Sequence, residues 1–483
     1  MITVDRLMKQ IQQAIRDQGK TGYFVGGGVR DLLLENRERI QDLDFVIQGD
    51  PKPLMDGLRE ILGGTLVEME KKVPLTRLVL KDGLMLDFME MQGRTIEEDL
   101  KGRDFTICAM AYPLDGPWPM KEDLLIDPYG GLKDLRRNLI RMTSGDVFDE
   151  DPLRLIRAPR LMAQLGLDLD NDTARMIREK SHLIRKAAGE RLNRELFLIL
   201  KEKRSHYYLS YMDRKLDLIN KLFPEIDCMK DIGECKYHVV DSWTHSIYTV
   251  KVAESIIYAH GFFEDHIREN YERHAEEKIT KDHKRLELIK LGALFHDIGK
   301  PSAKKVDTTG RTRFRGHEIT GAELVKEYGE QLKMSRREIE ILYKYVSLHM
   351  IPLVLYKKND VSGKALYNFF EEAGKETLDL LLIALSDIVS TRKLLEPTEE
   401  MGMFKIHVEY IANNYITRYR PIEDISKVIS GKEVMDAVKL PEGAFVGQVL
   451  EDIKKAMFYG HIPQSKEGAH RYLKQYFREN EEK

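Results

Sequence analysis

A glycine-rich turn near the start of the chain limits its possible folds more than any other feature does. Tyr23 to Val25 predict a short strand, Gly26 to Gly28 predict a turn, and Val29 to Leu34 predict the beginning of a helix. Glycines allow the backbone to approach a phosphate closely, and the first amides of a helix attract an anion. Arg30 adds a guanidinium group at the same place. The stretch therefore predicts a phosphate-binding turn between a strand and a helix.

A second predicted strand follows and carries two acidic side chains. From Asp42 to Ile47 apolar residues alternate along the strand, so Asp42 and Asp44 are expected on one face. Two neighbouring carboxylates can hold the same metal ions. Together with glycine amides and an arginine, they predict Mg²⁺-dependent polyphosphate chemistry. A structural glycine turn beside a solvated Asp-x-Asp is the alternative. The order strand, glycine turn, helix and Asp-x-Asp strand resembles the nucleotidyltransferase superfamily.

The composition predicts a globular protein with several domains. The chain has 483 residues, of which 42% are hydrophobic and 33% are charged. Its net charge of −3 predicts no global attraction to nucleic acid, so RNA binding requires a local basic surface. No signal peptide or bilayer-spanning apolar run is evident, which predicts a cytoplasmic protein without a membrane partner. The cysteines fit neither a disulfide framework nor a Cys-x-x-Cys metal site, and burial is expected for Cys108, Cys228 and Cys235.

Further strands are expected to complete the sheet of this first domain. They are predicted over residues 63–68, 75–80 and 84–89. Asp87, on the last of them, is either a third carboxylate beside Asp42 and Asp44 or a structural aspartate. Lys101 to Ala111 predict a helix that presents Arg103 to a phosphate or a ribose.

A charged stretch after this domain predicts another helix with a polar face. Pro152 suits the first turn of a helix. Asp151, Arg154 and Arg157 follow one another at intervals of three residues, so they are expected on one face. Taken alone, the pattern also fits an exposed face that carries ion pairs.

The stretches together resemble the class II tRNA nucleotidyltransferase and bacterial poly(A) polymerase family. The motifs are Gly-Gly-x-Val-Arg-Asp, Asp-x-Asp, Arg-Asp-Phe-Thr-Ile-x-Ala-Met-Ala, Asp-Pro-x-Gly-Gly-Leu-x-Asp-Leu and Glu-Asp-Pro-Leu-Arg-x-x-Arg, followed by residues 189–196. The resemblance implies that Asp42 and Asp44 hold the catalytic Mg²⁺. It implies that Asp151 and Arg154 pair with the base of CTP or ATP. The other nucleotide contacts that it implies come from Gly27, Arg30, Arg103, Arg157 and Arg160.

Three departures from the family pattern bear on the reaction. Cys108 stands where the family usually has asparagine. Pro159 is expected to kink a helix that usually lacks proline. Only residues 88–102 separate the strand of Asp87 from Arg103, whereas family members that add the terminal A usually have a longer flexible loop. We therefore expect efficient addition of CC, poor addition of A, and a partner enzyme that supplies the A.

A basic segment follows between Arg175 and Lys215. It predicts amphipathic helices in which basic residues far outnumber acidic ones. A solvated surface is the usual explanation of such a run. Because it follows a polymerase-like domain, we interpret it as a track for the RNA backbone.

Histidine and aspartate recur along the middle of the chain. A single helical histidine is usually structural, but the ordered set resembles the HD superfamily of metal-dependent phosphohydrolases. The resemblance implies one metal ion bound by His245, His296, Asp297 and Asp387. It extends the site to a second ion through His317 and His349. Imidazole and carboxylate ligands together suit Mn²⁺, Fe²⁺, Co²⁺ or Ni²⁺.

Two further segments complete the chain. The charged insert from Glu264 to Lys284 is expected to be a solvated excursion. After Leu395 the chain predicts helices and resembles the tail of HD-containing tRNA nucleotidyltransferases, with RNA contacts conceivable at Lys432, Lys454 and Lys455.

The sequence as a whole predicts an α+β fold, in which a small mixed-sheet nucleotidyltransferase head is followed by all-α neck, HD and tail domains. The expected boundaries are 1–143, 144–228, 229–400 and 401–483. The expected function is addition of CMP, with or without AMP, to the 3′ end of tRNA, together with an HD phosphohydrolase activity. The expected partners are tRNA, CTP and ATP, and the oligomeric state is left open. The alternatives are a poly(A) polymerase and an HD phosphohydrolase whose head only binds RNA.

Overall fold

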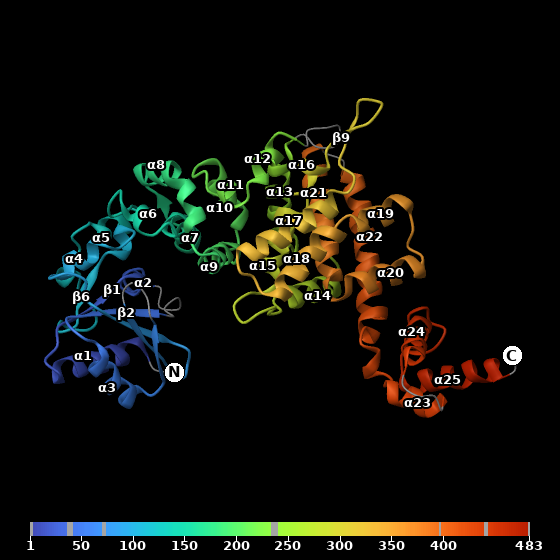
Figure 1. Cartoon of the computed structure of the whole chain (residues 1–483), viewed down its shortest axis with the longest axis horizontal. Coiled ribbons are helices and arrows are strands. Elements are labelled where there is room, and N and C mark those ends of the chain that lie inside the picture. Colours follow the sequence, from blue (N-terminus) through green and yellow to red (C-terminus); the bar gives the residue numbers. More distant parts are fainter. Residues whose placement is uncertain are drawn as a thin grey trace. The chain divides into compact units, whose positions relative to one another are not determined.

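The chain forms two compact units (Figure 1). The computed structural model describes residues 3–35, 42–69, 74–232, 240–395, 398–438 and 443–481. One unit comprises residues 1–195 and 211–222, and the other comprises residues 196–210 and 223–483. Cys235 and the beginning of the motif at Leu440 lie outside the described residues. The four domain boundaries given above stay predictions.

A six-stranded mixed sheet forms the head, in the order β3-β4-β5-β2-β1-β6. Its strands are β1 (Gly22–Val25), β2 (Asp42–Ile47), β3 (Thr65–Met69), β4 (Leu75–Val79), β5 (Met85–Glu90) and β6 (Ala111–Pro113). β2 pairs in parallel with β5, and the other neighbouring strands are antiparallel. The mixed sheet and the helical remainder confirm the predicted fold class.

Alternating apolar side chains determine which face of this sheet is buried. Leu43, Phe45 and Ile47 are completely buried in the core, where the ring of Phe45 stacks on that of Phe88 at 4.5 Å between centroids. The helices α1 (Val4–Asp17) and α3 (Lys52–Leu62) contribute their apolar sides to the same core and lie along this face of the sheet (Figure 1). Because side chains alternate along a strand, this packing leaves the two aspartates of β2 on the opposite face.

The predicted helix from Lys101 to Ala111 is wrong. The chain forms instead the helix α4 (Ile96–Lys101), the short 3₁₀ helix η2 (Thr106–Cys108) and then strand β6. Ala111 pairs with Val25 in the β1–β6 ladder, and this pairing with the sheet outweighs the local helical pattern. Arg103 therefore lies in the connection after α4 rather than on a helix.

The helix that carries Arg154 begins later than the sequence predicts. α6 (Val147–Glu150) ends before Asp151, and α7 (Arg154–Leu165) begins after Pro152. Asp151 has extended backbone angles, with φ −143° and ψ 100°, because a proline disfavours the helical conformation of the residue before it. The prediction that Asp151 shares one helix face with Arg154 and Arg157 is therefore wrong. Pro159 lies inside α7, which continues through it to Leu165.

The helices predicted for the basic segment are confirmed. They are α8 (Asn171–Lys180), η4 (Ser181–Lys186), α9 (Gly189–Leu200) and α10 (Ser205–Arg214), followed by α11 (Ile219–Leu222). Some basic side chains of this segment are bound within the protein. Arg178 donates from Nη1 to the backbone oxygen of Arg214 at 3.1 Å, and Arg185 donates from Nε to that of Lys221 at 2.9 Å. Part of the predicted RNA track thus serves the fold itself.

Helices make up most of the second unit. They include α12 (Glu225–Lys230), α13 (Ser242–Ile256), α14 (Asp265–Ala275), α15 (Arg285–Phe295), α16 (Lys300–Ala303), α17 (His317–Gln331), α18 (Arg336–Leu348), α19 (Ile351–Lys358) and α21 (Thr377–Leu395). Gly299 sits where a Cβ atom would be 2.1 Å from the backbone oxygen of His317. The glycine therefore allows the turn after Asp297 to pack directly against the beginning of α17.

The charged insert from Glu264 to Lys284 is not a solvated excursion, contrary to the prediction. Its helix α14 buries Ile267, Tyr271 and His274, which recur at helical spacing on one side. His274 Nε2 lies 2.8 Å from Oδ1 of the buried Asp379 on α21. The charged residues occupy the other side of the helix, and their number concealed the buried face in the sequence.

The last part of the chain is helical, as predicted. Its elements include α20 (Gly363–Ala373), α22 (Thr398–Asn414), α23 (Gly431–Val438), α24 (Ala444–Phe458) and α25 (Lys466–Glu481). Lys454 is buried, with its Nζ 2.6 Å from Glu371 and 4.8 Å from the centre of the Tyr419 ring. This lysine therefore holds α24 in place and is not free for the RNA contact considered above.

One described segment, residues 336–358, has the length and apolarity of a bilayer-spanning helix. It consists of α18 and α19, and α18 packs against α15, α17 and α21. The apolar side chains of α18 that give this signal, such as Ile341, Leu342 and Val346, are buried in the second unit. We therefore assign the segment to the protein core.

Candidate functional site

The glycine turn brings backbone, a carboxylate and a guanidinium group close together. Gly26 has φ +74° and donates its amide hydrogen to the backbone oxygen of Met110 at 3.3 Å. A Cβ atom at Gly26 would lie 3.0 Å from Arg103 Nη1 and 3.2 Å from Asp44 Oδ2. Only glycine combines this backbone angle with such close neighbours. The helix α2 (Gly27–Leu33) begins directly after the turn, close to the predicted position.

Arg30 lies on α2, just after the glycine turn, and its side chain is buried. Its Nε donates to Asp31 Oδ1 at 2.8 Å, and its Nη1 lies 3.3 Å from Cys108 Sγ. Cys108 is buried, as predicted, and its contact with Nη1 helps to position Arg30. Cys228 is exposed, which corrects the prediction that it is buried.

Three carboxylates gather on the polar face of the sheet. Asp44 on β2 lies opposite Asp87 on β5 in the parallel register, and Asp42 lies two residues before Asp44. Burial raises the pKa of Asp44 to about 6, against the lowering effect of the Arg103 charge, and burial also raises the pKa of Asp42. Asp42 Oδ1 is buried and has no hydrogen-bond partner among the described residues. A buried, unpartnered carboxylate oxygen beside a second carboxylate fits a cation site.

Asp87 is held by an arginine of the neighbouring strand. Arg77 binds both of its carboxylate oxygens, at 2.7 Å from Nε and 2.6 Å from Nη2. Asp87 thus lies near Asp42 and Asp44 while it makes a structural ion pair.

The predicted phosphate-binding arginines surround the same face and have acidic partners. Arg103 Nη2 lies 3.6 Å from Asp99 Oδ1, and Arg157 Nε lies 3.0 Å from Asp104 Oδ2. Arg160 pairs with Glu195 at 2.8 Å. The charges of Arg103 and Arg157 both lower the pKa of Asp44, so these two guanidinium groups lie within electrostatic reach of the carboxylates.

The two residues predicted to read the base have separate partners. Asp151 forms a two-pronged ion pair with Arg191, at 3.2 Å to Nη1 and 2.6 Å to Nη2. Burial raises the pKa of Asp151, but the hydrogen bond and charge of Arg191 outweigh this and lower it. Arg154 Nη1 donates to Glu150 Oε2 at 3.0 Å. Arg191 was not among the predicted site residues, although it lies in a motif that carried the family resemblance.

The short segment before Arg103 is a capped helix rather than a flexible loop. The hydroxyl group of Thr95 caps α4 by accepting from the amide of Glu98 at 3.4 Å, and the Glu98 carboxylate accepts from the amide of Arg94 at 2.7 Å. Ile96 and Leu100 are buried. The segment after α4 contacts α7, because Arg154 Nη2 donates to the backbone oxygen of Gly102 at 2.7 Å. The folded segment and α7 are therefore in direct contact.

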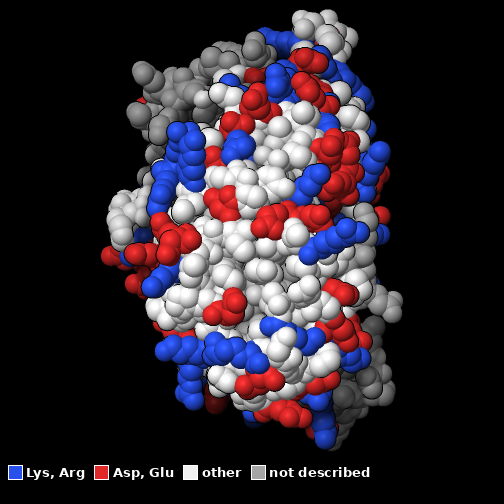
Figure 2. Space-filling model, turned by 90° about the vertical axis from the view of Figure 1, so that its left-hand side faces the viewer, with Lys and Arg blue, Asp and Glu red and all other residues white. Residues whose placement is uncertain are grey.

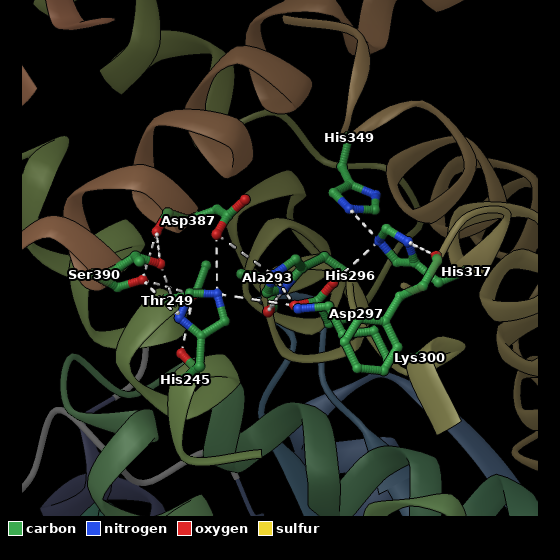
Figure 3. Close-up of polar contacts among 12 residues, drawn as sticks. His245, Thr249, Ala293, His296, Asp297, Lys300, His317, His349, Asp387 and Ser390 are labelled. Atoms are coloured by element: carbon green, nitrogen blue, oxygen red, sulfur yellow. Dashed lines mark hydrogen bonds and ion pairs between the residues drawn. The ribbon is translucent and has the colours of Figure 1, made fainter. Parts of the chain in front are cut away.

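The structure brings all six predicted HD residues together from separate elements (Figure 3). His245 lies on α13 and Asp387 on α21, His296 and Asp297 follow α15, His317 begins α17, and His349 follows α18. His245, His296 and Asp297 offer ligand atoms within 4.8 Å of one another, and so do Asp297, His317 and His349. Asp387 Oδ1 lies 2.9 Å from His245 Nε2. Asp297 belongs to both groups, which fits a carboxylate shared between two ions.

Backbone carbonyl groups orient three of these imidazoles. The Nδ1 atoms of His296, His317 and His349 lie 2.9, 2.8 and 2.7 Å from the backbone oxygens of Ala293, Phe314 and Val346. Because a carbonyl oxygen only accepts, each Nδ1 carries a hydrogen, and each ring turns its Nε2 toward the centre. This second contact is typical of metal-binding histidines.

The charges of the centre also suit metal binding. Burial and the neighbouring charges of His296 and His317 lower the pKa of His349 to about 3, so its ring is neutral. Burial raises the pKa of Asp297, but Lys300 and His296 outweigh this and hold it below its usual range. His296 Nε2 is buried 3.2 Å from Asp297 Oδ2, and burial lowers the pKa of His296, but the carboxylate of Asp297 outweighs this and raises it. A neutral imidazole at His349 and an ionised carboxylate at Asp297 are ligands that suit a divalent transition metal.

Comparisons with known proteins agree with both sites. Residues 22–141 match the poly A polymerase head domain, residues 166–229 match a probable RNA and SrmB-binding site of polymerase A, and residues 242–392 match the HD domain. The fold and the two clusters therefore define a nucleotidyltransferase that also carries an HD domain. In these segments the chain is similar to poly(A) polymerases and tRNA nucleotidyltransferases.

Relatives with different nucleotide specificities resemble the whole chain. The CC-adding tRNA nucleotidyltransferase of Thermus thermophilus is 28% identical, over 94% of this chain and 93% of its own. The A-adding tRNA nucleotidyltransferase of Deinococcus radiodurans is 26% identical, over 91% and 92%. The Thermotoga maritima CCA-adding enzyme complexed with tRNA has the same fold, with a TM-score of 0.60 and 22% identity over 98% of this chain and 95% of that chain.

Proposed function

We propose that the protein transfers CMP, and AMP less efficiently, from CTP and ATP to the 3′ end of tRNA. The observation that carries the proposal is the pair Asp42 and Asp44 beside the Gly26 turn, with one carboxylate oxygen buried and unpartnered. These two residues would hold Mg²⁺, which when bound supplies activation of the RNA hydroxyl group and neutralisation of the leaving pyrophosphate. The relatives named above support tRNA as the substrate.

The side chains around the carboxylates would position the triphosphate. Gly27 and Arg30 lie at the start of α2, and Arg103 lies beside Gly26, so amide and guanidinium groups can bind its oxygens. The 3′ hydroxyl group of the RNA gives its proton to water while its oxygen forms a bond to the α phosphorus, and the bond from that phosphorus to the bridging oxygen breaks. Pyrophosphate leaves with the electron pair, so the arginines stabilise charge that develops at the leaving group. Arg157 and Arg160 would support this side of the pocket.

Asp151 and Arg154 would select the base. An acceptor carboxylate and a donor guanidinium group can present the hydrogen-bonding pattern of a pairing base. At present Asp151 is bonded to Arg191, and Arg154 is bonded to Glu150. The base of a bound nucleotide would have to displace both of these partners. While the ion pair with Arg191 is formed, the carboxylate of Asp151 would not be available to accept a hydrogen bond from a base.

The final A would be added poorly and left to a partner enzyme. The support for this is the ordered helix α4, which has a capped first turn and buried apolar residues. A segment that is already folded has less freedom to move the base-reading side chains between C and A. Both CC-adding and A-adding relatives align with most of the chain, so the comparisons do not favour one of these specificities.

The HD centre would be a metal-dependent phosphohydrolase that removes a terminal or cyclic phosphate from RNA. His245, His296, Asp297 and Asp387 would hold one divalent transition metal ion, with His317 and His349 completing a second site. Such an ion, when bound, supplies a nucleophilic hydroxide at neutral pH. The candidate ions are Mn²⁺, Fe²⁺, Co²⁺ and Ni²⁺. For the whole protein we propose a cytoplasmic location, where tRNA, CTP and ATP are present.

The assay that tests the leading function uses tRNA that ends before CCA. It is incubated with CTP and ATP, separately and together. Incorporation that starts with CTP supports the tRNA function, and long runs of A with ATP alone would favour a poly(A) polymerase instead. Release of phosphate without any nucleotide incorporation would favour an HD phosphohydrolase whose head only binds RNA.

A further inference from the structure

A cavity beside the HD centre is much larger than a metal site requires. Its volume is about 880 Å³, and Asp297, His317 and Asp387 form one end of it. A water molecule and a phosphate group would fill only a small part of this space. The remaining wall therefore has room for the rest of a substrate.

Basic side chains form one side of this cavity. The hairpin of β9 (Lys305–Val306) and β10 (Thr312–Arg313) leads into Arg315, and Arg313, Arg315 and Lys357 all line the cavity and are exposed. Arg313 pairs with Asp307 at 3.0 Å. Within the described ranges, Arg315 and Lys357 have no ion-pair partner. Two exposed cations without partners, near a phosphate-hydrolysing centre, suit the negative charges of a nucleic acid backbone.

An apolar wall faces the same space. Met350, Leu353 and Val354 line it around the beginning of α19, and Ile388 lines it from α21. The side chains on α19 are not fully covered by the protein, and Val354 is 39% exposed. A nucleobase is a flat, largely apolar group that gains by covering such a surface. Acidic residues also reach the cavity, since Glu318 and Glu400 line it, and Glu318 lies 3.3 Å from His317 Nδ1.

We propose that the β9–β10 hairpin and α19 form a binding site for an RNA 3′ end, and that Arg315 and Lys357 are specificity-determining residues of the HD centre. The terminal base would lie on the apolar wall, and upstream phosphates would lie against Arg315 and Lys357. The centre thereby selects a phosphoester carried by an RNA chain over the same ester in a small molecule. This inference rests on the proposed phosphohydrolase function. In a cyclic phosphate end, a water oxygen bonds to phosphorus, one of the two ester P–O bonds breaks, and the departing ribose oxygen takes a proton from the water.

The test compares two substrates in the full-length, metal-loaded protein. One is a short RNA oligonucleotide that ends in a 2′,3′-cyclic phosphate, and the other is bis(p-nitrophenyl) phosphate. We expect Arg315→Ala and Lys357→Ala each to lower the ratio of the two kcat/KM values by about five- to tenfold, mainly through KM for the RNA. In wild type, that KM should also rise with salt more steeply than in the double variant.

Neighbouring residues of the same type provide matched controls. Arg311 lies on the same hairpin and Lys358 on the same helix, and both are exposed without lining the cavity. Arg311→Ala and Lys358→Ala should leave the ratio unchanged. An equal loss in all four variants, or no loss in any, would overturn the assignment of Arg315 and Lys357 while leaving the HD activity in place. If wild type cleaves neither substrate but still adds CMP to tRNA, the HD function fails and this inference fails with it.

Discussion

Arg154 Nη2 donates a hydrogen bond to the backbone oxygen of Gly102 at 2.7 Å. The contact joins a predicted base-reading residue on α7 to the residue that directly follows α4. A movement of either partner thus changes the environment of the other, and it does so without a long flexible loop. Recognition of two different bases would require Arg154 to take two positions. Because α4 is capped and partly buried, the contact favours only one of them.

Removing either carboxylate of β2 should abolish nucleotide transfer. We expect Asp42→Asn and Asp44→Asn to reduce CMP incorporation by about 100-fold or more, because each loses a charged ligand for the ion that balances the triphosphate. Incorporation of labelled CMP into truncated tRNA measures this. Asp56→Asn, a half-exposed position on α3 whose ion-pair partner is Arg59 of the same helix, serves as the control and should retain activity. Near-normal incorporation by either β2 variant would remove the catalytic assignment.

Changes at the base-reading pair should affect nucleotide choice more than turnover. Asp151→Ala and Arg154→Ala are expected to lose roughly 1 to 3 kcal/mol of discrimination between correct and incorrect bases. Competition of CTP and ATP against UTP and GTP on the same tRNA measures it. Arg175→Ala, which breaks only an exposed ion pair with Asp172, is the matched control. If both variants kept the wild-type preference, the templating role of this pair would be wrong.

Strand periodicity and the resemblance to known families were sufficient to predict the two clusters of candidate ligand residues. Asp42 and Asp44 follow from strand periodicity, and the imidazoles of His245 and His296 come together because their helices are core elements with strong apolar patterns. The partner of Asp151 was harder to predict. Arg191 lies far away in sequence within a run of basic residues, and only the tertiary fold selects it from that run.

The errors in the sequence analysis share a physical cause. Residues 101–111 have a helical pattern, but strand pairing at Ala111 decides their structure. The region around α14 looks solvated because charged residues dominate its composition, yet Ile267, Tyr271 and His274 form a buried stripe. In both cases tertiary contacts outweigh the average local preference.

The two reaction centres should fail independently. Asp297→Asn is expected to abolish metal-dependent release of phosphate from RNA and to leave CMP incorporation intact, whereas Asp44→Asn should do the opposite. The reason is that Asp297 belongs to both groups of candidate metal ligands and lies in a different compact unit from Asp44. Metal analysis of protein purified without chelators checks the same assignment. Wild-type protein free of transition metal and without phosphate release would weigh heavily against it.

The buried ion pair of His274 and Asp379 predicts a stability change with pH. Burial lowers the pKa of His274, but Asp379 outweighs this and raises the value from 6.5 to about 9. The folded state therefore holds the proton more tightly than the unfolded state does. The resulting stabilisation is fully present below pH 6.5 and is lost as the pH rises to about 9, with a magnitude of roughly 3 kcal/mol at most.

Calorimetry of wild type and His274→Gln across that pH range tests this. Wild type should lose more of its thermal stability between pH 6.5 and 9 than the variant does. His260→Gln changes an exposed histidine and should follow wild type. Parallel curves for wild type and His274→Gln would show that this pair does not control the dependence.

The last prediction concerns the end of the product. After two additions of C, a single enzyme that completes CCA has to reposition Asp151 and Arg154 for A. In this protein Arg154 is bonded to Gly102 directly after the capped helix α4, Asp151 is paired with Arg191, and Pro159 restricts the rest of α7. We therefore expect truncated tRNA, given both CTP and ATP, to accumulate ends in CC, with the final A appearing only slowly. Sequencing the 3′ ends over time measures the distribution, and addition of a separate A-adding enzyme should convert CC ends to CCA. Mostly complete CCA ends from the protein alone would show that the short, folded segment does not limit the change of base.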